Sequence, residues 1–308
     1  MKLSVIRTKF NMHPSIKVYK DSVFNFINRD FEIITLADDC LFTEGPVWNQ
    51  EGFYLFSDIP TNCVYKIDEK KNKQVFLEKS GTDNPDDPDL EQARKQIGSN
   101  ALAYDDEGSL LICQHGGHGV AKYDGKSLQP FIQFYNNKPF NSPNDLILHN
   151  DGSLYFSDPP YGLKDGKLNP GKFQALAGVY CWKENELQLI CDKYQYPNGV
   201  CLSNNKKTLY ICSTKEYERF VSTYDTSNNS FIKIFAEENG DGIEVDRYDN
   251  IYLCNKDGII ILDRNGERLA LIALPKVPAN ICWGGKDMND LFITARENVF
   301  LIKDFQRK

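Results

Sequence analysis

Six oxygen-bearing side chains open six copies of one short sequence pattern, and their types suit a hard cation. In each copy an acidic or amide residue comes first, followed by an apolar run, a tight turn and a second apolar run. The lead residues are Glu44, Asn100, Asn144, Asn198, Asp241 and Asn280. Carboxylate and amide oxygens are the ligands that Ca²⁺ prefers, whereas zinc favours His and Cys. The sequence therefore predicts a site for one divalent cation, Ca²⁺ first, with Mg²⁺, Mn²⁺ or Zn²⁺ as alternatives.

The spacing of the copies indicates a ring-shaped all-β fold. The steps between lead positions 44, 100, 144, 198, 241 and 280 are 56, 44, 54, 43 and 39 residues. Periods of about 40 to 50 residues with several short strands each are typical of propeller blades. We therefore predict a six-bladed β-propeller whose inner strands surround a central channel. One repeat position would then recur around that channel and bring the lead residues to a single axial site.

We expect one propeller domain at 31–308, preceded by an N-terminal extension at 1–30 that carries no repeat. The repeats continue without a break in composition, so two separate domains are not favoured. The segment 31–36 has strand character, and we expect it to pair with 299–302. Such a closure joins the N- and C-terminal segments and removes a free sheet edge.

Charge and composition narrow the choice of partners. The net charge of −7 and the pI near 5.3 argue against nucleic acid, because phosphates are held mainly by Lys and Arg. No stretch approaches the roughly 18 apolar residues of a membrane span, and residues 1–11 lack the apolar core of a secretory signal. The nine cysteines form no C-x-x-C pair, which favours a reducing compartment. We expect a cytoplasmic monomer or homodimer that binds neither nucleic acid nor membrane.

Two insertions account for the longest steps between repeats. The first spans 80–98, where Asp87 and Pro88 form a helix-start pattern that predicts a short helix ending before Gly98. The second spans 159–177 and begins within the sequence Asp158-Pro-Pro-Tyr-Gly162. Both fall in the same half of a blade period. We therefore expect them near one rim, where they would narrow access to the channel.

Residues next to the lead positions also bear on the site. Small residues let backbones crowd at the channel, and a Gly or Ala follows Glu44, Asn100, Asn198 and Asp241. His115 comes just after the second repeat, and we consider it a candidate for substrate contact at the rim. A simpler explanation of the lead residues stays open, because Asn and Asp often precede strands as turn formers that bond their own backbone.

Several longer motifs occur in order over about residues 30 to 303. They are Phe42-Thr-Glu-Gly-Pro-Val-Trp48, Phe56-Ser-Asp-Ile-Pro60, Ser142-Pro-Asn-Asp145, Tyr155-Phe-Ser-Asp-Pro-Pro-Tyr-Gly162, Pro197-Asn-Gly199, Asp241-Gly-Ile243, Pro278-Ala-Asn280 and Leu291-Phe-Ile-Thr294. Together they resemble the senescence-marker-protein, gluconolactonase and luciferin-regenerating-enzyme family of six-bladed propellers, especially bacterial-type gluconolactonases.

The resemblance implies a hydrolase of small lactones with a divalent metal in the channel. Glu44, Asn198 and Asp241 match metal ligands, and Asn144 matches a residue at the metal that also meets substrate. We add Asn100 and His115 as candidate substrate contacts. Gln114 and the pair Gly117-His118 replace the commoner residues around His115, so the resemblance leaves the identity of the lactone open.

Our hypothesis for the chemistry is that the metal polarises the lactone carbonyl and that Asp241 positions or deprotonates the attacking water. A hydroxide on the metal stays an alternative nucleophile. The sequence contains neither a G-x-S-x-G nor an H-E-x-x-H motif. Two other classes stay open: a non-catalytic, calcium-stabilised propeller that binds a ligand, and a paraoxonase-like esterase on the same fold.

Overall fold

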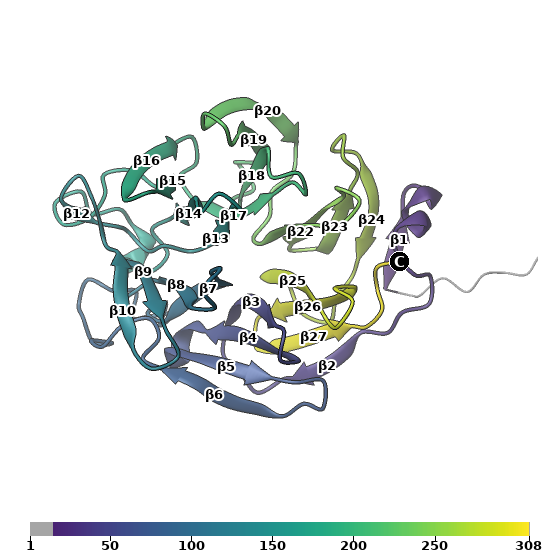
Figure 1. The fold of residues 1–308 in the computed structure, drawn as a ribbon, viewed down its shortest axis with the longest axis horizontal. Coiled ribbons are helices and arrows are strands. Elements are labelled where there is room, and N and C mark those ends of the chain that lie inside the picture. The colour runs from purple at the N-terminus through teal and green to yellow at the C-terminus, as the bar shows by residue number, and fades with distance from the viewer. Residues whose placement is uncertain (1–14, 308) are drawn as a thin grey trace, which may run out of the picture.

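The computed structural model describes residues 15–307, which form six antiparallel sheets arranged as blades around a central axis (Figure 1). The predicted six-bladed β-propeller is therefore confirmed. These residues contain no α-helix; their helical turns are the short 3-10 segments η1 (Asp21–Asn25), η2 (Ile59–Thr61) and η3 (Lys164–Gly166). The first fourteen residues of the expected N-terminal extension lie outside the described residues.

The innermost strand of each blade contains a lead residue or follows one directly. These strands are β3 (Thr43–Asn49), β7 (Ser99–Tyr104), β13 (Leu146–Leu148), β17 (Pro197–Leu202), β21 (Ile243–Val245) and β25 (Asn280–Gly284). Asn144 and Asp241 lie two residues before their short strands, and the other four lead residues lie within theirs. The repeat therefore places its first residue at the same end of every inner strand.

The remaining strands follow outward in chain order, except that β2 from the N-terminal segment is the outermost strand of the sixth blade. The second strands are β4 (Phe53–Asp58), β8 (Leu110–Gln114), β14 (Leu154–Asp158), β18 (Thr208–Ser213), β22 (Ile251–Asn255) and β26 (Asp290–Ala295). The third strands are β5 (Cys63–Ile67), β9 (Gly119–Tyr123), β15 (Gly178–Lys183), β19 (Val221–Asp225), β23 (Gly258–Leu262) and β27 (Asn298–Ile302). The fourth strands are β6 (Lys73–Glu78), β10 (Leu128–Ile132), β16 (Glu186–Cys191), β20 (Ser230–Ala236), β24 (Arg268–Ile272) and β2 (Ile34–Ala37).

The ring is closed by strands from both ends of the chain. β2 pairs antiparallel with β27, with Thr35 opposite Phe300, and Figure 1 shows the purple β2 beside the yellow β27. This is the predicted closure. A further strand, β1 (Ile16–Val18), pairs with β24 on the outside of the fifth blade. A small hairpin of β11 (Phe134–Tyr135) and β12 (Lys138–Pro139) lies between the second and third blades.

The core lies between neighbouring blades, where the second strands are apolar on both faces. Every residue of β22 and β26 is buried, and such continuous apolar runs are expected of strands covered on two sides. Eight of the nine cysteines are buried and share this role. All nine are free thiols, and burial raises the pKa of Cys113, Cys212 and Cys254 well above its ordinary value. These thiols therefore act as small core residues.

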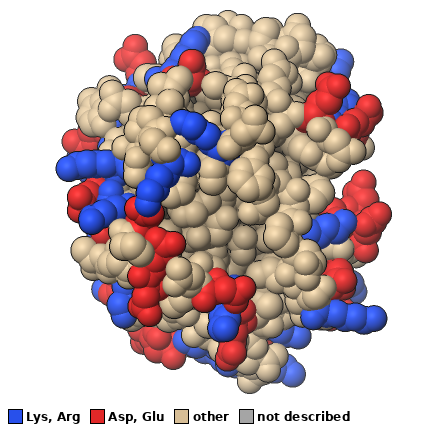
Figure 2. Space-filling view, turned by 90° about the vertical axis from the view of Figure 1, so that its left-hand side faces the viewer, with Lys and Arg blue, Asp and Glu red and all other residues tan. Residues whose placement is uncertain are grey.

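No helix in the described range 15–307 has the length and apolar character needed to span a bilayer. Figure 2 shows the side of the ring that carries β10, β12 and β16. Lys and Arg side chains are interspersed there with Asp and Glu. Surface ion pairs such as Lys183 with Asp151 and Lys122 with Glu107 fit this mixture.

Candidate active site

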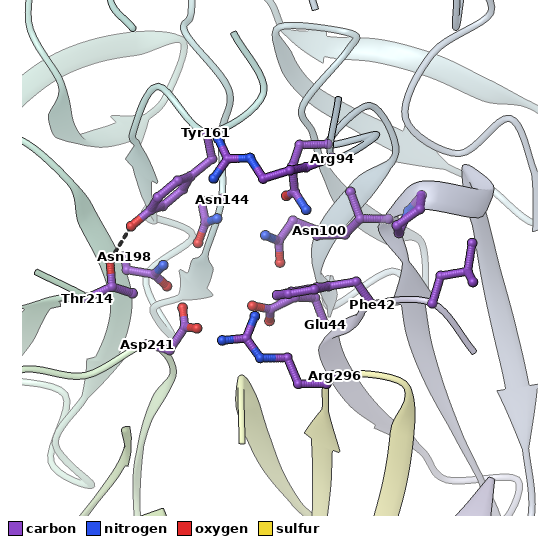
Figure 3. A pocket seen from close by; sticks show the side chains of 14 residues that line it. Phe42, Glu44, Arg94, Asn100, Asn144, Tyr161, Asn198, Thr214, Asp241 and Arg296 are labelled. Carbon is purple, nitrogen blue, oxygen red and sulfur yellow. Dashed lines mark hydrogen bonds between the residues drawn. The ribbon is translucent and has the colours of Figure 1, made fainter. Parts of the chain in front are cut away.

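The lead residues meet at a cavity of about 530 Å³ at the end of the channel where the inner strands begin (Figure 3). Five of the six line it: Glu44, Asn100, Asn144, Asn198 and Asp241. Asn280 is not among the lining residues. Its Oδ1 accepts a hydrogen bond of 2.8 Å from the backbone N–H of Ile281, and its side chain also bonds to Glu44. The structure thus gathers every expected metal ligand, together with Asn100.

Backbone irregularities turn these side chains toward the cavity. The pairing of β3 with β4 shifts register between Glu44 and Val47, and that of β17 with β18 shifts between Pro197 and Val200. Such bulges re-aim side chains at the rims of β-structures. In each of these blades the lead residue lies at the shift, so the irregularity belongs to the site.

Small residues after the lead positions allow neighbouring blades to approach, as the sequence predicted. Gly45 has a φ of +52°, and a Cβ placed there would lie 2.1 Å from the carbonyl oxygen of Asn100. Gly199 donates a hydrogen bond of 3.0 Å to the carbonyl of Asp241. An added Cβ at Gly199 would lie 2.5 Å from that same oxygen. Glycine at these positions therefore holds adjacent lead residues together.

Two buried aspartates fix the loops that enter the inner strands. Asp58, at the end of β4, accepts hydrogen bonds from the backbone N–H groups of Leu41 and Phe42 at 3.1 and 2.9 Å. Asp158, at the end of β14, does the same for Asn141 and Ser142 at 2.9 and 2.8 Å. The repeated sequence Phe-Ser-Asp thus secures the segments just before Glu44 and Asn144.

Burial raises the proton affinity of both lead carboxylates. In Figure 3 the carboxylates of Glu44 and Asp241 face one another across the cavity. Burial raises the pKa of Glu44 well above its ordinary value, and the charge of Asp241 raises it further. Burial also raises the pKa of Asp241 to about 7, although Arg296 and a hydrogen bond from Asn198 lower it. Two such carboxylates need a compensating positive charge when both are ionised.

His115 sits behind the amides of two lead residues. It is fully buried, its Nε2 lies 3.3 Å from Nδ2 of Asn100 and 3.4 Å from Nδ2 of Asn144, and it does not line the cavity. Burial lowers its pKa to about 3, so the ring is neutral at physiological pH. With both amide nitrogens facing Nε2, that atom is the acceptor. The amide oxygens of Asn100 and Asn144 are thereby turned toward the cavity, as Figure 3 shows.

The two insertions contact one another and supply part of the cavity wall. The N–H of Glu91 donates to the carbonyl of Gly162 at 2.9 Å, and that of Lys164 donates to Asp89 at 2.7 Å. The first insertion contributes Arg94 and Gln96 to the cavity, and the second contributes Tyr161. Tyr161 forms a hydrogen bond with the hydroxyl of Thr214, drawn in Figure 3.

The prediction of a short helix after Asp87 is wrong, because the segment forms turns instead. The carboxylate of Glu91 accepts from the N–H groups of Ala93 and Arg94, at 3.1 and 3.4 Å. The N–H of Glu91 itself bonds to the second insertion. These contacts take up donors that a helix would use, so local side-chain bonding and tertiary contact override the helix-start pattern.

Several cavity residues were not identified from the sequence. Arg94 and Arg296 both line the cavity. In Figure 3 the guanidinium of Arg296 lies beside the carboxylates of Glu44 and Asp241, whereas that of Arg94 lies near Tyr161. Phe42 packs against the guanidinium of Arg296. Tyr161 lies within a motif that the sequence analysis quoted, but that motif does not show which way its side chain points. Arg94 and Arg296 lie on loops without a repeat signature. Only the tertiary structure brings them to the site.

The residues present fit a hard divalent cation. Within 15–307 no three His, Cys, Asp or Glu side chains form a metal cluster, so any cation here must also use amide oxygens. Glu44 and Asp241 offer two carboxylates, and Asn144 and Asn198 offer amides on the same cavity. An all-oxygen set with two mutually repelling, buried carboxylates is chemistry that suits Ca²⁺ better than zinc.

Comparison with known proteins places the chain in a family. The sequence profile of the SMP-30/Gluconolactonase/LRE-like region matches residues 42–297. The chain belongs to this family. It is 31% identical over 291 residues to a gluconolactonase of Zymomonas mobilis, covering 88% of this chain and 81% of that one. The resemblance found from the motifs is thereby confirmed.

Solved structures of the same architecture support the fold. A gluconolactonase from Xanthomonas campestris matches with a TM-score of 0.79 and 23% identity over 95% of both chains. Regucalcin, a calcium-binding protein from Agrobacterium tumefaciens, matches with a TM-score of 0.70 and 17% identity, covering 90% of this chain and 95% of that one. At these identities the two structures are similar to this protein in fold.

Proposed function

We propose that this protein is a lactonase that hydrolyses small, sugar-derived lactones with the help of one divalent cation. Membership of a family that includes gluconolactonases supports lactone hydrolysis. The observation that carries the proposal is the facing pair Glu44 and Asp241 on the main cavity, with the amides of Asn144 and Asn198 beside them. These four residues would hold the cation, and Ca²⁺ is the first candidate.

When bound, the cation would withdraw electron density from the lactone carbonyl and offset the charge that develops on its oxygen. The protein's own residues do the rest. Asp241 holds the attacking water and accepts its proton, and its hydrogen bond from Asn198 fixes the carboxylate for this task. Asn100 and Asn144 turn amide oxygens toward the cavity and orient substrate hydroxyls. Tyr161 and Thr214 add hydroxyl groups to the same wall.

The test is a pH-stat screen of aldonolactones with Ca²⁺, Mg²⁺, Mn²⁺ and Zn²⁺ in turn. We expect hydrolysis that a chelator abolishes and added metal restores. Asp241→Asn should lower kcat by a factor of about 10³ or more, since the proton acceptor is lost. Asp249→Asn, on the turn at the other end of the same blade, is the matched control and should keep wild-type activity.

Two results would contradict the proposal. One is wild-type turnover by Asp241→Asn. The other is no hydrolysis of any lactone with any of the four ions, which would instead favour a propeller that binds a ligand without turnover. Chelation separates these classes independently, because a purely structural ion changes the melting temperature through its binding free energy and has no turnover to abolish.

A further inference from the structure

Two arginines reach the cavity from different insertions and loops, and the proposed reaction does not use either. Arg94 comes from the insertion after β6, and Arg296 from the loop between β26 and β27. Figure 3 shows their guanidinium groups on opposite sides of the cavity that Glu44 and Asp241 line. A neutral sugar lactone gives two cationic side chains no charge to bind. Their presence bears on the substrate.

Arg296 is held firmly in its place. It is the first residue of a two-residue connection, with Ala295 paired to Asn298, and its φ is +55°. Glycine is the residue usually found at such a position, so a long cationic side chain there is unexpected on backbone grounds. The carbonyl of Arg296 accepts hydrogen bonds from the N–H and hydroxyl of Thr43, at 2.7 and 2.9 Å. Its guanidinium lies 4.9 Å from the centre of the Phe42 ring.

The contacts of Arg296 bind it to the segment that carries Glu44. Phe42 supports its side chain and Thr43 its backbone, and both directly precede Glu44. The arginine is therefore fixed relative to the proposed cation site, with its side chain exposed to the cavity.

Fewer contacts hold the side chain of Arg94 in position than hold Arg296. One of its guanidinium nitrogens lies 3.4 Å from the buried carboxylate of Glu91, which balances its charge. The rest of the group is exposed toward the cavity. Arg94 thus offers hydrogen-bond donors to a substrate, while its charge is already paired.

Among the charged side chains that line the cavity, a bound dication would leave one positive charge without a partner. A dication would neutralise the carboxylates of Glu44 and Asp241, and Glu91 balances Arg94. Glu297, next to Arg296, is paired with Lys276. The positive charge of Arg296 then remains at the cavity wall, in a position suited to an anionic ligand group.

The cavity also has room for such a group. A side pocket of about 180 Å³ shares Thr214, Asp241 and Arg296 with the main cavity. Its wall includes Asn239, Lys256 and Glu216, and the last two form an ion pair with each other. Arg296 therefore stands where the two spaces meet, so a group bound to it can extend away from the reacting carbonyl.

We propose that the preferred substrate is an anionic lactone, with a carboxylate or phosphate group that Arg296 binds. This inference rests on the proposed lactonase function. Arg94 donates further hydrogen bonds to the same substrate. The guanidinium fork matches the paired oxygens of either anion. Arg296 is therefore a specificity residue, and the lactone ring itself is held by the residues around Glu44 and Asp241.

The test compares three lactones: neutral gluconolactone, glucarolactone with a carboxylate, and 6-phosphogluconolactone with a phosphate. We expect kcat/KM to be at least about tenfold higher for one of the anionic lactones than for gluconolactone. The selectivity ratio is kcat/KM for an anionic lactone divided by kcat/KM for gluconolactone. Arg296→Gly should lower this ratio by about tenfold or more, mainly by raising KM for the anionic lactone. The anionic lactone whose ratio falls identifies the bound group.

The choice of glycine keeps the test independent of folding. Glycine adopts the φ of +55° without strain, so the variant should melt at or above the wild-type temperature. Arg264→Gln, on an exposed loop of the fifth blade, is the control and should leave the ratio unchanged. Titration calorimetry of glucarate and gluconate should show the same dependence on Arg296, with tighter binding of the dianion by the wild type.

The outcomes separate the two proposals. The wild type could hydrolyse gluconolactone as well as the anionic lactones or better, with no effect of Arg296→Gly on the selectivity ratio. That result would overturn the proposal of an anionic substrate and leave the proposed lactonase function intact. No hydrolysis of any lactone, but binding of glucarate that depends on Arg296, overturns the lactonase and supports the anion site. Neither hydrolysis nor Arg296-dependent binding overturns both.

Discussion

Nε2 of His115 lies 3.3 Å from Nδ2 of Asn100, so a residue buried behind the cavity sets the orientation of one that lines it. The same nitrogen lies 3.4 Å from Nδ2 of Asn144. One neutral imidazole therefore holds two amides with their oxygens toward the site. The sequence analysis expected His115 to contact substrate. That contact stays a prediction, and the geometry gives the histidine a positioning role.

We predict that His115→Ala lowers metal affinity and kcat/KM by about 10- to 100-fold, the usual loss when a group supporting a metal ligand is removed. Without the imidazole, both amides can rotate and offer nitrogen instead of oxygen. Calorimetric titration of Ca²⁺ and steady-state kinetics measure the two effects. His149→Gln, on the turn after β13, is the control. Unchanged Ca²⁺ affinity in His115→Ala would contradict the positioning role.

Gly45→Ala should destabilise the protein far more than Gly52→Ala. Both glycines have positive φ, so both variants suffer backbone strain. A Cβ at position 45 also overlaps the backbone of Asn100, whereas nothing lies within 4 Å of one at position 52. We expect an additional cost of about 2 kcal/mol or more for Gly45→Ala. Urea unfolding of the two variants checks this, and equal losses would refute the crowding between blades.

Asp58→Ala should lower stability and displace Phe42. The carboxylate accepts from two partly buried backbone N–H groups, those of Leu41 and Phe42, and both would lose their partner. Each unsatisfied donor costs about 1–3 kcal/mol. We expect the free energy of unfolding, measured in urea, to fall by several kcal/mol. We also expect a weaker preference for anionic lactones, because the side chain of Arg296 packs on Phe42. Asp68→Ala, on the exposed turn after β5, is the control. Equal stability of the two variants would count against this account.

Stability should fall as pH rises toward 7 because of Glu244 on β21. Burial raises the pKa of this carboxyl to about 7 from an ordinary value of 4.5, although the N–H of Val245 and the charge of Lys206 lower it. Between these values the folded state holds a proton that the unfolded chain has released. Raising the pH therefore favours unfolding, by up to about 3 kcal/mol above pH 7.

The matching variant is Glu244→Gln, which cannot ionise. We expect it to gain stability relative to the wild type as pH rises from 5 to 8, and to show a smaller slope of unfolding free energy against pH. Urea unfolding at intervals across this range measures both. If the free energy of unfolding has the same slope against pH in the wild type and in Glu244→Gln, Glu244 is not the group responsible.

The sequence alone determined the ring and the residues at its axis. The six copies of the repeat fix which strand is innermost, and the lead position places Glu44, Asn144, Asn198 and Asp241 around one channel. Periodicity can carry this information because a repeated strand pattern has only a few ways to bury its apolar faces. The closing strand 31–36 followed from the same need to cover a sheet edge.

Only the tertiary structure decided what surrounds that axis. Asn280 shares the repeat but does not line the cavity, and the expected helix after Asp87 gives way to contacts between the two insertions. Arg94, Arg296 and His115 reach or support the cavity through loops without a repeat. Their positions depend on contacts between residues far apart in the chain, such as Arg296 with Thr43, and a local sequence pattern holds no record of such contacts.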